Sequence, residues 1–108
     1  WLVAVGFEER AVYRDDRDER RVVHAEYVWP HGGGVMFSSY AESPDWPTRP
    51  GTAASYLVCD DCDEVFARAT AAGATALKAP EDQDYGGRAA TVRDPEGNLW
   101  SVGTYAGE

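Results

Sequence analysis

His24 and Glu26 are the side chains of this sequence whose types and spacing best suit polar chemistry. They stand two residues apart in Arg21–Trp29, a stretch typical of a β-strand, so both lie on one face of it. A neutral imidazole beside a carboxylate can act as a base with an orienting partner, or bind a cationic ligand group. The pair equally suits an internal hydrogen bond, a solvent-exposed rim, or two ligands of a displaced metal site.

Cys59 and Cys62 have the C-x-x-C spacing of redox and zinc sites. A closed zinc site needs about four ligands, and only His24 and His31 remain as nitrogen donors. Cys59 ends the apolar run Ser55–Cys59 and Cys62 begins a helix, positions that suit small buried side chains. We therefore expect two buried thiols in a reducing, cytoplasmic compartment.

The composition limits the kinds of partner that the protein can bind. The 108 residues suffice for one domain and contain no apolar run of membrane-spanning length. The net charge is −9, with seven acids and five bases up to Tyr40 and twelve acids and five bases after it. Such a surface repels nucleic-acid phosphates and anionic lipid, so we expect neither a nucleic acid nor a membrane as partner.

The second half of the chain is predicted to have the order β-α-β-β-β. Asp60 or Asp61 caps a helix whose apolar residues recur at the helical period, and Gly73 ends it. Asp94-Pro95-Glu96-Gly97 is typical of a hairpin turn. The predicted elements are strand Ser55–Cys59, helix Asp61–Ala72, strand Thr75–Ala79, a polar loop Pro80–Gly87, and strands Arg88–Arg93 and Asn98–Thr104.

The first half repeats this order. Gly6 and Pro30 are 24 residues apart, and Gly73 and Pro95 are 22 apart. The repeat predicts one helical turn at Trp1–Val5 and strands Glu8–Arg14, Arg21–Trp29 and Gly34–Ser39. The opening strand has no counterpart, so we expect upstream sequence or a partner chain to supply it. The predicted single domain comprises module one (1–40), a linker (41–52) and module two (53–108).

These motifs resemble the glyoxalase/bleomycin-resistance/dioxygenase superfamily, also called vicinal oxygen chelate. The resemblance covers essentially the whole chain. Its motifs are Tyr85-Gly86-Gly87-Arg88 followed after five residues by Asp94–Trp100, with Gly6-Phe7-Glu8, His24-Ala25-Glu26 and Asp60-Asp61. It implies an α+β fold in which two βαβββ modules pair into a curved sheet, a homodimer, and a small-molecule ligand bound in the cup.

The metal-ligand positions of that family fall on unsuitable residues. By the resemblance, they correspond to Met36, about Ala54, and Ser101. Thioether, methyl and hydroxyl groups are poor ligands for the divalent metals that the family uses. We therefore expect no cofactor, with a divalent metal as the alternative.

The same register identifies candidate binding residues. If Ser101 faces the cup, strand alternation places Leu99 and Gly103 on the same face and Trp100 and Val102 on the helix side. Trp46, in the Pro-rich linker, suits a clamp over the core, a dimer contact or ligand stacking, and Arg88 suits an ion pair with Asp84 or Asp94, or an anionic ligand. The predicted ligand-binding set is His24, Glu26, Met36, Ser38, Trp46, Tyr56, Tyr85, Arg88 and Ser101.

Three functions are compatible with these features. The leading hypothesis is a metal-free protein that binds or sequesters a cationic or aromatic compound in an acidic, aromatic-lined cleft. The alternative is a metal-dependent lyase, isomerase or dioxygenase whose site is completed by upstream sequence or a partner chain. The third is a structural or regulatory dimer without a ligand.

Overall fold

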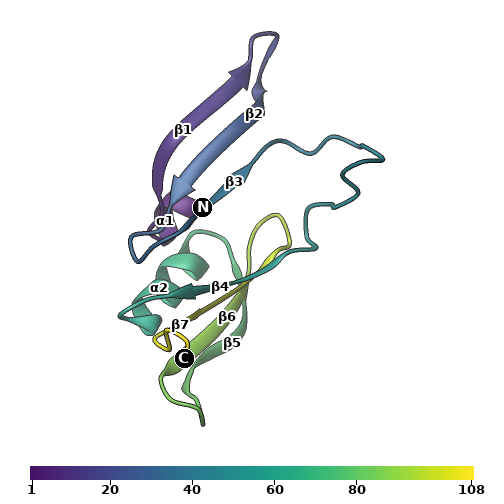
Figure 1. Cartoon of the computed structure of the whole chain (residues 1–108). Helices are drawn as coiled ribbons and strands as arrows, with labels where there is room; N and C mark the ends of the chain where they lie inside the picture. Colours follow the sequence, from purple (N-terminus) through teal and green to yellow (C-terminus); the bar gives the residue numbers. More distant parts are fainter.

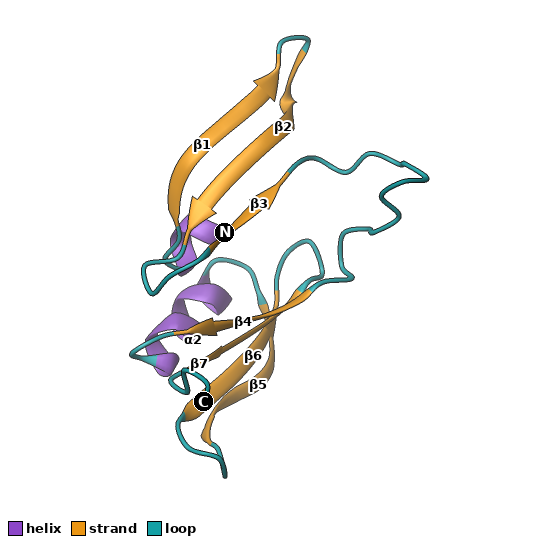
Figure 2. Cartoon of the chain, in the orientation of Figure 1, coloured by secondary structure: helices purple, strands orange, loops and turns teal.

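The computed structural model describes residues 1–108, and its elements follow the predicted order (Figures 1 and 2). Neither helix is long and apolar enough to cross a membrane. The elements are α1 (Leu2–Val5), β1 (Glu8–Asp15), β2 (Asp18–Val28), β3 (Gly34–Phe37), β4 (Ala54–Val58), α2 (Cys62–Ala71), β5 (Thr75–Asp82), β6 (Arg88–Arg93) and β7 (Leu99–Gly103).

The strands form two sheets that repeat one arrangement. The first sheet has the order β1-β2-β3, and the second has β4-β7-β6-β5. The antiparallel meander β1-β2-β3 corresponds to β5-β6-β7, while β4 lies parallel to β7 and has no counterpart in the first sheet. The predicted duplication is therefore confirmed, and within this chain the two halves form separate sheets.

Helix α2 confirms the predicted local signals. The Asp61 carboxylate accepts a hydrogen bond from the backbone N–H of Glu64 at 3.0 Å, so Asp61 is the N-cap. The apolar face of α2 is buried, and its buried residues are Cys62, Val65 and Ala69. Gly73 follows the last turn with φ 115°, a backbone conformation that only glycine adopts without strain.

Strand β5 is longer than predicted. The loop expected at Pro80–Gly87 begins only after Asp82, because residues 80–82 continue the strand. Pro80 lacks a backbone N–H, but β5 is the edge strand of its sheet, and the pairing with β6 shifts register between Lys78 and Glu81. A proline is tolerated at such an irregular edge position, which is why the sequence signal for a loop was misleading here.

Other boundaries differ by a few residues. Strand β2 begins at Asp18 rather than Arg21, since β1 and β2 continue to a tight turn after Asp15. Strand β3 ends at Phe37 rather than Ser39. Boundaries of this kind depend on cross-strand pairing, which local sequence does not specify.

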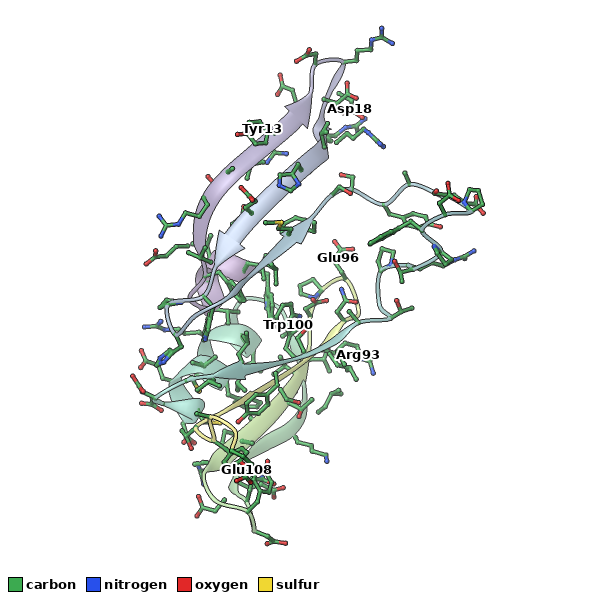
Figure 3. The ribbon with its side chains drawn as sticks, viewed as in Figure 1. Tyr13, Asp18, Arg93, Glu96, Trp100 and Glu108 are labelled. Carbon is green, nitrogen blue, oxygen red and sulfur yellow. The ribbon has the colours of Figure 1, made fainter.

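The core lies where the two halves meet. Helix α1 packs on α2, and the Trp29 indole N–H donates to the Val58 carbonyl at 2.7 Å, which joins β2's end to β4. Phe7, Trp29 and Trp100 bring their rings together in this core. In Figure 3 Trp100 lies near the middle of the molecule between the two sheets, as expected from its predicted helix-facing register.

Candidate functional site

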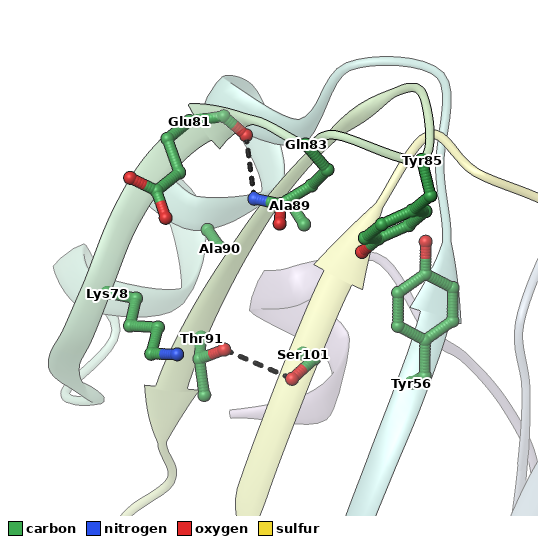
Figure 4. Close-up of a pocket in the computed structure, with 9 residues that line it drawn as sticks. All are labelled: Tyr56, Lys78, Glu81, Gln83, Tyr85, Ala89, Ala90, Thr91 and Ser101. Atoms are coloured by element: carbon green, nitrogen blue, oxygen red, sulfur yellow. Dashed lines mark hydrogen bonds between the residues drawn. The ribbon is translucent and has the colours of Figure 1, made fainter.

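A pocket of about 230 Å³ lies on the second sheet, on the side of the Ser101 side chain (Figure 4). We call this side the open face. Side chains from all four strands of that sheet and from the loop after β5 form its lining. The lining residues are Tyr56, Lys78, Glu81, Gln83, Tyr85, Ala89, Ala90, Thr91 and Ser101.

Tyr56 and Tyr85 form an aromatic wall at one end of the pocket. The Tyr56 hydroxyl donates to the Tyr105 carbonyl at 2.7 Å, and the Tyr85 ring packs edge-on against the Tyr105 ring at 5.1 Å. Burial raises the pKa of the Tyr56 phenol above its ordinary value of 10.0. A Cβ at Gly103 would overlap the Tyr56 hydroxyl, so a larger residue here would displace the Tyr56 side chain.

Two hydroxyl groups form the polar floor. Thr91 on β6 lies directly opposite Ser101 on β7, and their side-chain oxygens are 3.1 Å apart. Lys78 on β5 lies directly opposite Thr91 on its other side. The cross-strand register thus places an ammonium and two hydroxyls in one row across the sheet.

Arg88, predicted to bind the ligand, does not line the pocket, because its side chain pairs with the start of α2 instead. Its guanidinium donates to both carboxylate oxygens of Asp63 at 2.8 and 3.2 Å, and to Asp82 at 3.3 Å. The predicted partners Asp84 and Asp94 were therefore wrong, because the start of α2 and the end of β5 lie closer to this guanidinium. Asp94 instead accepts a hydrogen bond from the Trp100 indole at 2.7 Å.

The Asp63–Arg88 pair predicts a pH dependence of stability. The hydrogen bonds from Arg88 hold the pKa of Asp63 below its ordinary value of 3.8. The stabilisation is therefore fully present above that ordinary value and is lost as the pH falls through the lower pKa of the folded protein. In urea denaturation at successive pH values, Asp63→Asn should flatten the loss of stability in this acid range.

Asp84→Asn is the matched control, because Asp84 belongs to no ion pair in the chain. It should leave the acid profile as in the wild type. An unchanged profile in the Asp63→Asn variant would contradict the assignment.

The first sheet carries the second group of predicted residues. His24 Nε2 lies 3.6 Å from Glu26 Oε1, Glu26 pairs with Met36 across the strands, and Tyr13 stacks on His24. Ala25 is buried on one face of this sheet, and these side chains cover the other face. They remain partly or largely exposed. No residue of this group lines the pocket of the second sheet.

Two further predicted residues belong to neither group. Ser38 follows the end of β3, and Trp46 lies in the linker with 74% of its surface exposed. Figure 1 shows this linker looping away from both sheets. Within one chain the predicted set is thus divided: Tyr56, Tyr85 and Ser101 meet in the pocket, while Trp46 does not line it.

The family's metal does not fit the residues at its positions. Met36 lies on β3 of the first sheet, whereas Ala54 and Ser101 lie on neighbouring strands of the second. No group of three or more His, Cys, Asp or Glu side chains is placed to hold an ion. A thioether, a methyl and a hydroxyl group supply no adequate donor set for a hard or borderline cation.

The cysteines are buried, as predicted. Cys59 and Cys62 are 4% and 2% exposed, and both thiols are free. Burial raises the pKa of Cys59 to about 11 and also raises the pKa of Cys62, so neither forms a reactive thiolate at neutral pH.

Sequence reasoning missed six of the nine residues that line the pocket. Thr91 was detectable, because strand alternation from the predicted inward Ser101 extends to its neighbour across the hairpin. Lys78, Glu81 and Gln83 were not, since two register shifts in β5 break the alternation and the segment from Pro80 was predicted to be a loop.

Comparison with known proteins gives the family context. The sequence pattern described as "Glyoxalase/Bleomycin resistance protein/Dioxygenase superfamily" matches residues 4–102. A 48-residue stretch is 48% identical to an uncharacterized protein of Mycobacterium tuberculosis strain H37Rv, covering 44% of this chain and 28% of that protein. The chain thus matches less than a third of that relative's length.

Solved structures share the fold. The crystal structure of TioX from Micromonospora sp. ML1 superimposes with a TM-score of 0.73 at 32% identity, covering 95% of this chain and 83% of TioX. TnmS3, an antibiotic binding protein from Streptomyces sp. CB03234, has a TM-score of 0.63 at 24% identity, covering 94% of this chain and 77% of TnmS3.

Proposed function

The chain belongs to the Glyoxalase/Bleomycin resistance protein/Dioxygenase superfamily, and from this premise we propose that it is a metal-free protein that binds or sequesters a cationic or aromatic small molecule. The observation that carries the proposal is the pocket on the open face, where two tyrosines face a polar floor. An apolar wall with a few fixed polar groups is the usual construction of a small-molecule site. TnmS3, described as an antibiotic binding protein, gives this reading a precedent within the fold.

The chemistry of the vacated ligand positions supports binding without a metal. Ser101, at one of these positions, is hydrogen-bonded to Thr91 and lines the pocket, so the position contributes to a polar surface instead. The proposal assigns the protein to the cytoplasm, where thiols such as those of Cys59 and Cys62 stay reduced.

We propose that the working unit is a homodimer. The chain is elongated, with extents of 49 × 28 × 27 Å and a radius of gyration of 15.0 Å, against about 13 Å for a compact domain of this size. It exposes 7305 Å², whereas a compact monomer of this mass exposes about 5,900 Å². The excess supports a second copy, which would cover the exposed face that bears His24, Glu26 and Met36 and deepen the pocket.

The pocket's size supports the same conclusion. Its volume of about 230 Å³ is below the range of about 300–1,000 Å³ usual for ligand sites. A second copy laid over the open face would enclose the pocket further.

Calorimetric titration tests the proposed function. The probes are bleomycin, a cationic acridine and a neutral naphthalene derivative, and we expect saturable binding of at least one. Replacing Tyr85, which is 59% exposed, by serine should weaken that binding about fivefold by removing a stacking surface.

Tyr40→Ser is the matched control, because Tyr40 is 48% exposed but lies outside the pocket. It should bind as the wild type does. Absence of binding by all three probes would refute the proposal. Equal losses of affinity in both variants would show that the ligand does not bind in this pocket.

The second candidate function is a metal-dependent lyase, isomerase or dioxygenase with its site completed by upstream sequence or a partner chain. The close His24–Glu26 pair favours it, since it offers one nitrogen and one oxygen donor on an exposed face. Elemental analysis of protein purified without chelator distinguishes the two functions. Near-stoichiometric zinc, nickel, manganese or iron would favour the enzyme.

A further inference from the structure

The pocket contains the only lysine of the chain. Lys78 is one basic residue among 10 in a sequence with 19 acids, yet it forms none of the chain's ion pairs or side-chain hydrogen bonds. Glu81 lines the same pocket but lies outside ion-pair distance. The three N–H donors of this ammonium are therefore free for a ligand.

The sheet aims this ammonium at the polar floor. Lys78 is the paired residue between two register shifts of β5, directly opposite Thr91. Figure 4 shows its ammonium pointing toward the Thr91 and Ser101 side chains rather than out along the edge strand. The irregularities on both sides thus re-aim one side chain, as strand bulges commonly do.

The floor is rich in hydrogen-bond donors. Thr91 and Ser101 share one hydrogen bond, which uses a single hydroxyl hydrogen and leaves the other available. The Lys78 ammonium and this hydroxyl hydrogen are both donors, so a ligand group that binds here needs to be a hydrogen-bond acceptor. A ligand ammonium placed here would meet Lys78 as a like charge at close range.

We infer that Lys78, with Thr91 and Ser101, binds a carboxylate, phenolate or carbonyl oxygen attached to an aromatic ring that lies against Tyr56 and Tyr85. The inference rests on the proposed function and narrows it to oxygen-bearing aromatic compounds at this pocket. Glu81 is the one acidic residue of the pocket lining. The rest of the net charge of −9 comes from residues outside the lining, and their effect is screened over about 8 Å at physiological ionic strength.

A matched series on one ring tests the inference. The probes are 2-naphthoate, naphthalene-2-carboxamide and 2-naphthylmethylammonium, titrated calorimetrically into the full chain. We expect 2-naphthoate to bind at least tenfold more tightly than the ammonium compound, since a charge-assisted hydrogen bond contributes about this much. Lys78→Met should abolish the preference, and Lys78→Arg should retain part of it.

Arg93→Met is the control for net charge. Arg93 lies on the same sheet, is exposed and does not line the pocket. Its removal should leave the preference for 2-naphthoate intact. Equal losses in Lys78→Met and Arg93→Met would show a general charge effect and overturn the inference.

Lys78 also offers a direct spectroscopic signal. Reductive methylation with ¹³C-formaldehyde labels only Lys78 and the terminal amine, because the chain has no other amino group. We expect 2-naphthoate to shift the Lys78 methyl resonance in the NMR spectrum. Binding without that shift, or tighter binding of 2-naphthylmethylammonium, would overturn the inference and leave the proposed function standing. If none of the three compounds binds, the inference fails, and the titrations with bleomycin and the acridine decide the proposed function separately.

Discussion

Replacing Trp100 by alanine is expected to lower the free energy of unfolding by about 3–5 kcal/mol, the usual cost of removing a buried tryptophan. Trp100 is 8% exposed, and its ring centroid lies 5.7 Å from that of Trp1 and 5.8 Å from that of Phe7. The substitution leaves a cavity between the two halves. It also removes the indole N–H that donates a hydrogen bond to the Asp94 carboxylate. Since domains are stable by only about 5–15 kcal/mol, this loss is a large fraction of the total.

Urea denaturation of the variant measures the effect, and Trp46→Ala is the matched control. Trp46 is the same residue type but is 74% exposed in the linker, so its removal should change stability by less than about 0.5 kcal/mol. Similar losses in the two variants would contradict the placement of Trp100 in the core. In a dimer the control is best measured at low protein concentration, where linker contacts with a partner contribute least.

Replacing Trp29 by alanine is expected to cost a similar amount, about 3–5 kcal/mol, and to act on the junction of the two halves. Trp29 is 7% exposed and packs on Phe7 with ring centroids 4.9 Å apart. Its indole N–H donates to the Val58 carbonyl at 2.7 Å, so the side chain links β2 to β4. The variant should lose stability and show increased hydrogen exchange along β4.

Trp29→Phe separates packing from hydrogen bonding. It keeps an aromatic ring but leaves the Val58 carbonyl without its donor, so its loss should be smaller than that of alanine and at least about 1 kcal/mol. A Trp29→Ala protein with normal protection of β4 would contradict the role of this side chain as a link between the halves.

Much of the fold was predictable because its signals are local. The helix from Cys62 was recognisable from the Asp61 cap and its apolar period, and the hairpin at Pro95 from its turn residues. The repeat then gave the order of the strands along the first half of the chain. In the same way, strand alternation correctly assigned Trp100 and Val102 to the core and Ser101 to the open face.

The site was harder to predict because its residues are brought together by pairing between distant strands. Tyr56 and Ser101 were identified, but Lys78 was not, since its orientation depends on register shifts that no local pattern encodes. The partner of Arg88 was mistaken for a related reason. Sequence neighbours such as Asp84 were considered, whereas Asp63 reaches the guanidinium from another element.

The sequence by itself determined the family and the duplicated order of elements, because side-chain chemistry and short-range periodicity are written directly in the chain. Only the tertiary structure decided that Lys78 joins Thr91 and Ser101 in a pocket, while His24 and Glu26 lie on a separate sheet. Strand register and the packing of the two halves sum many weak, distant contacts, and no window of local sequence contains them.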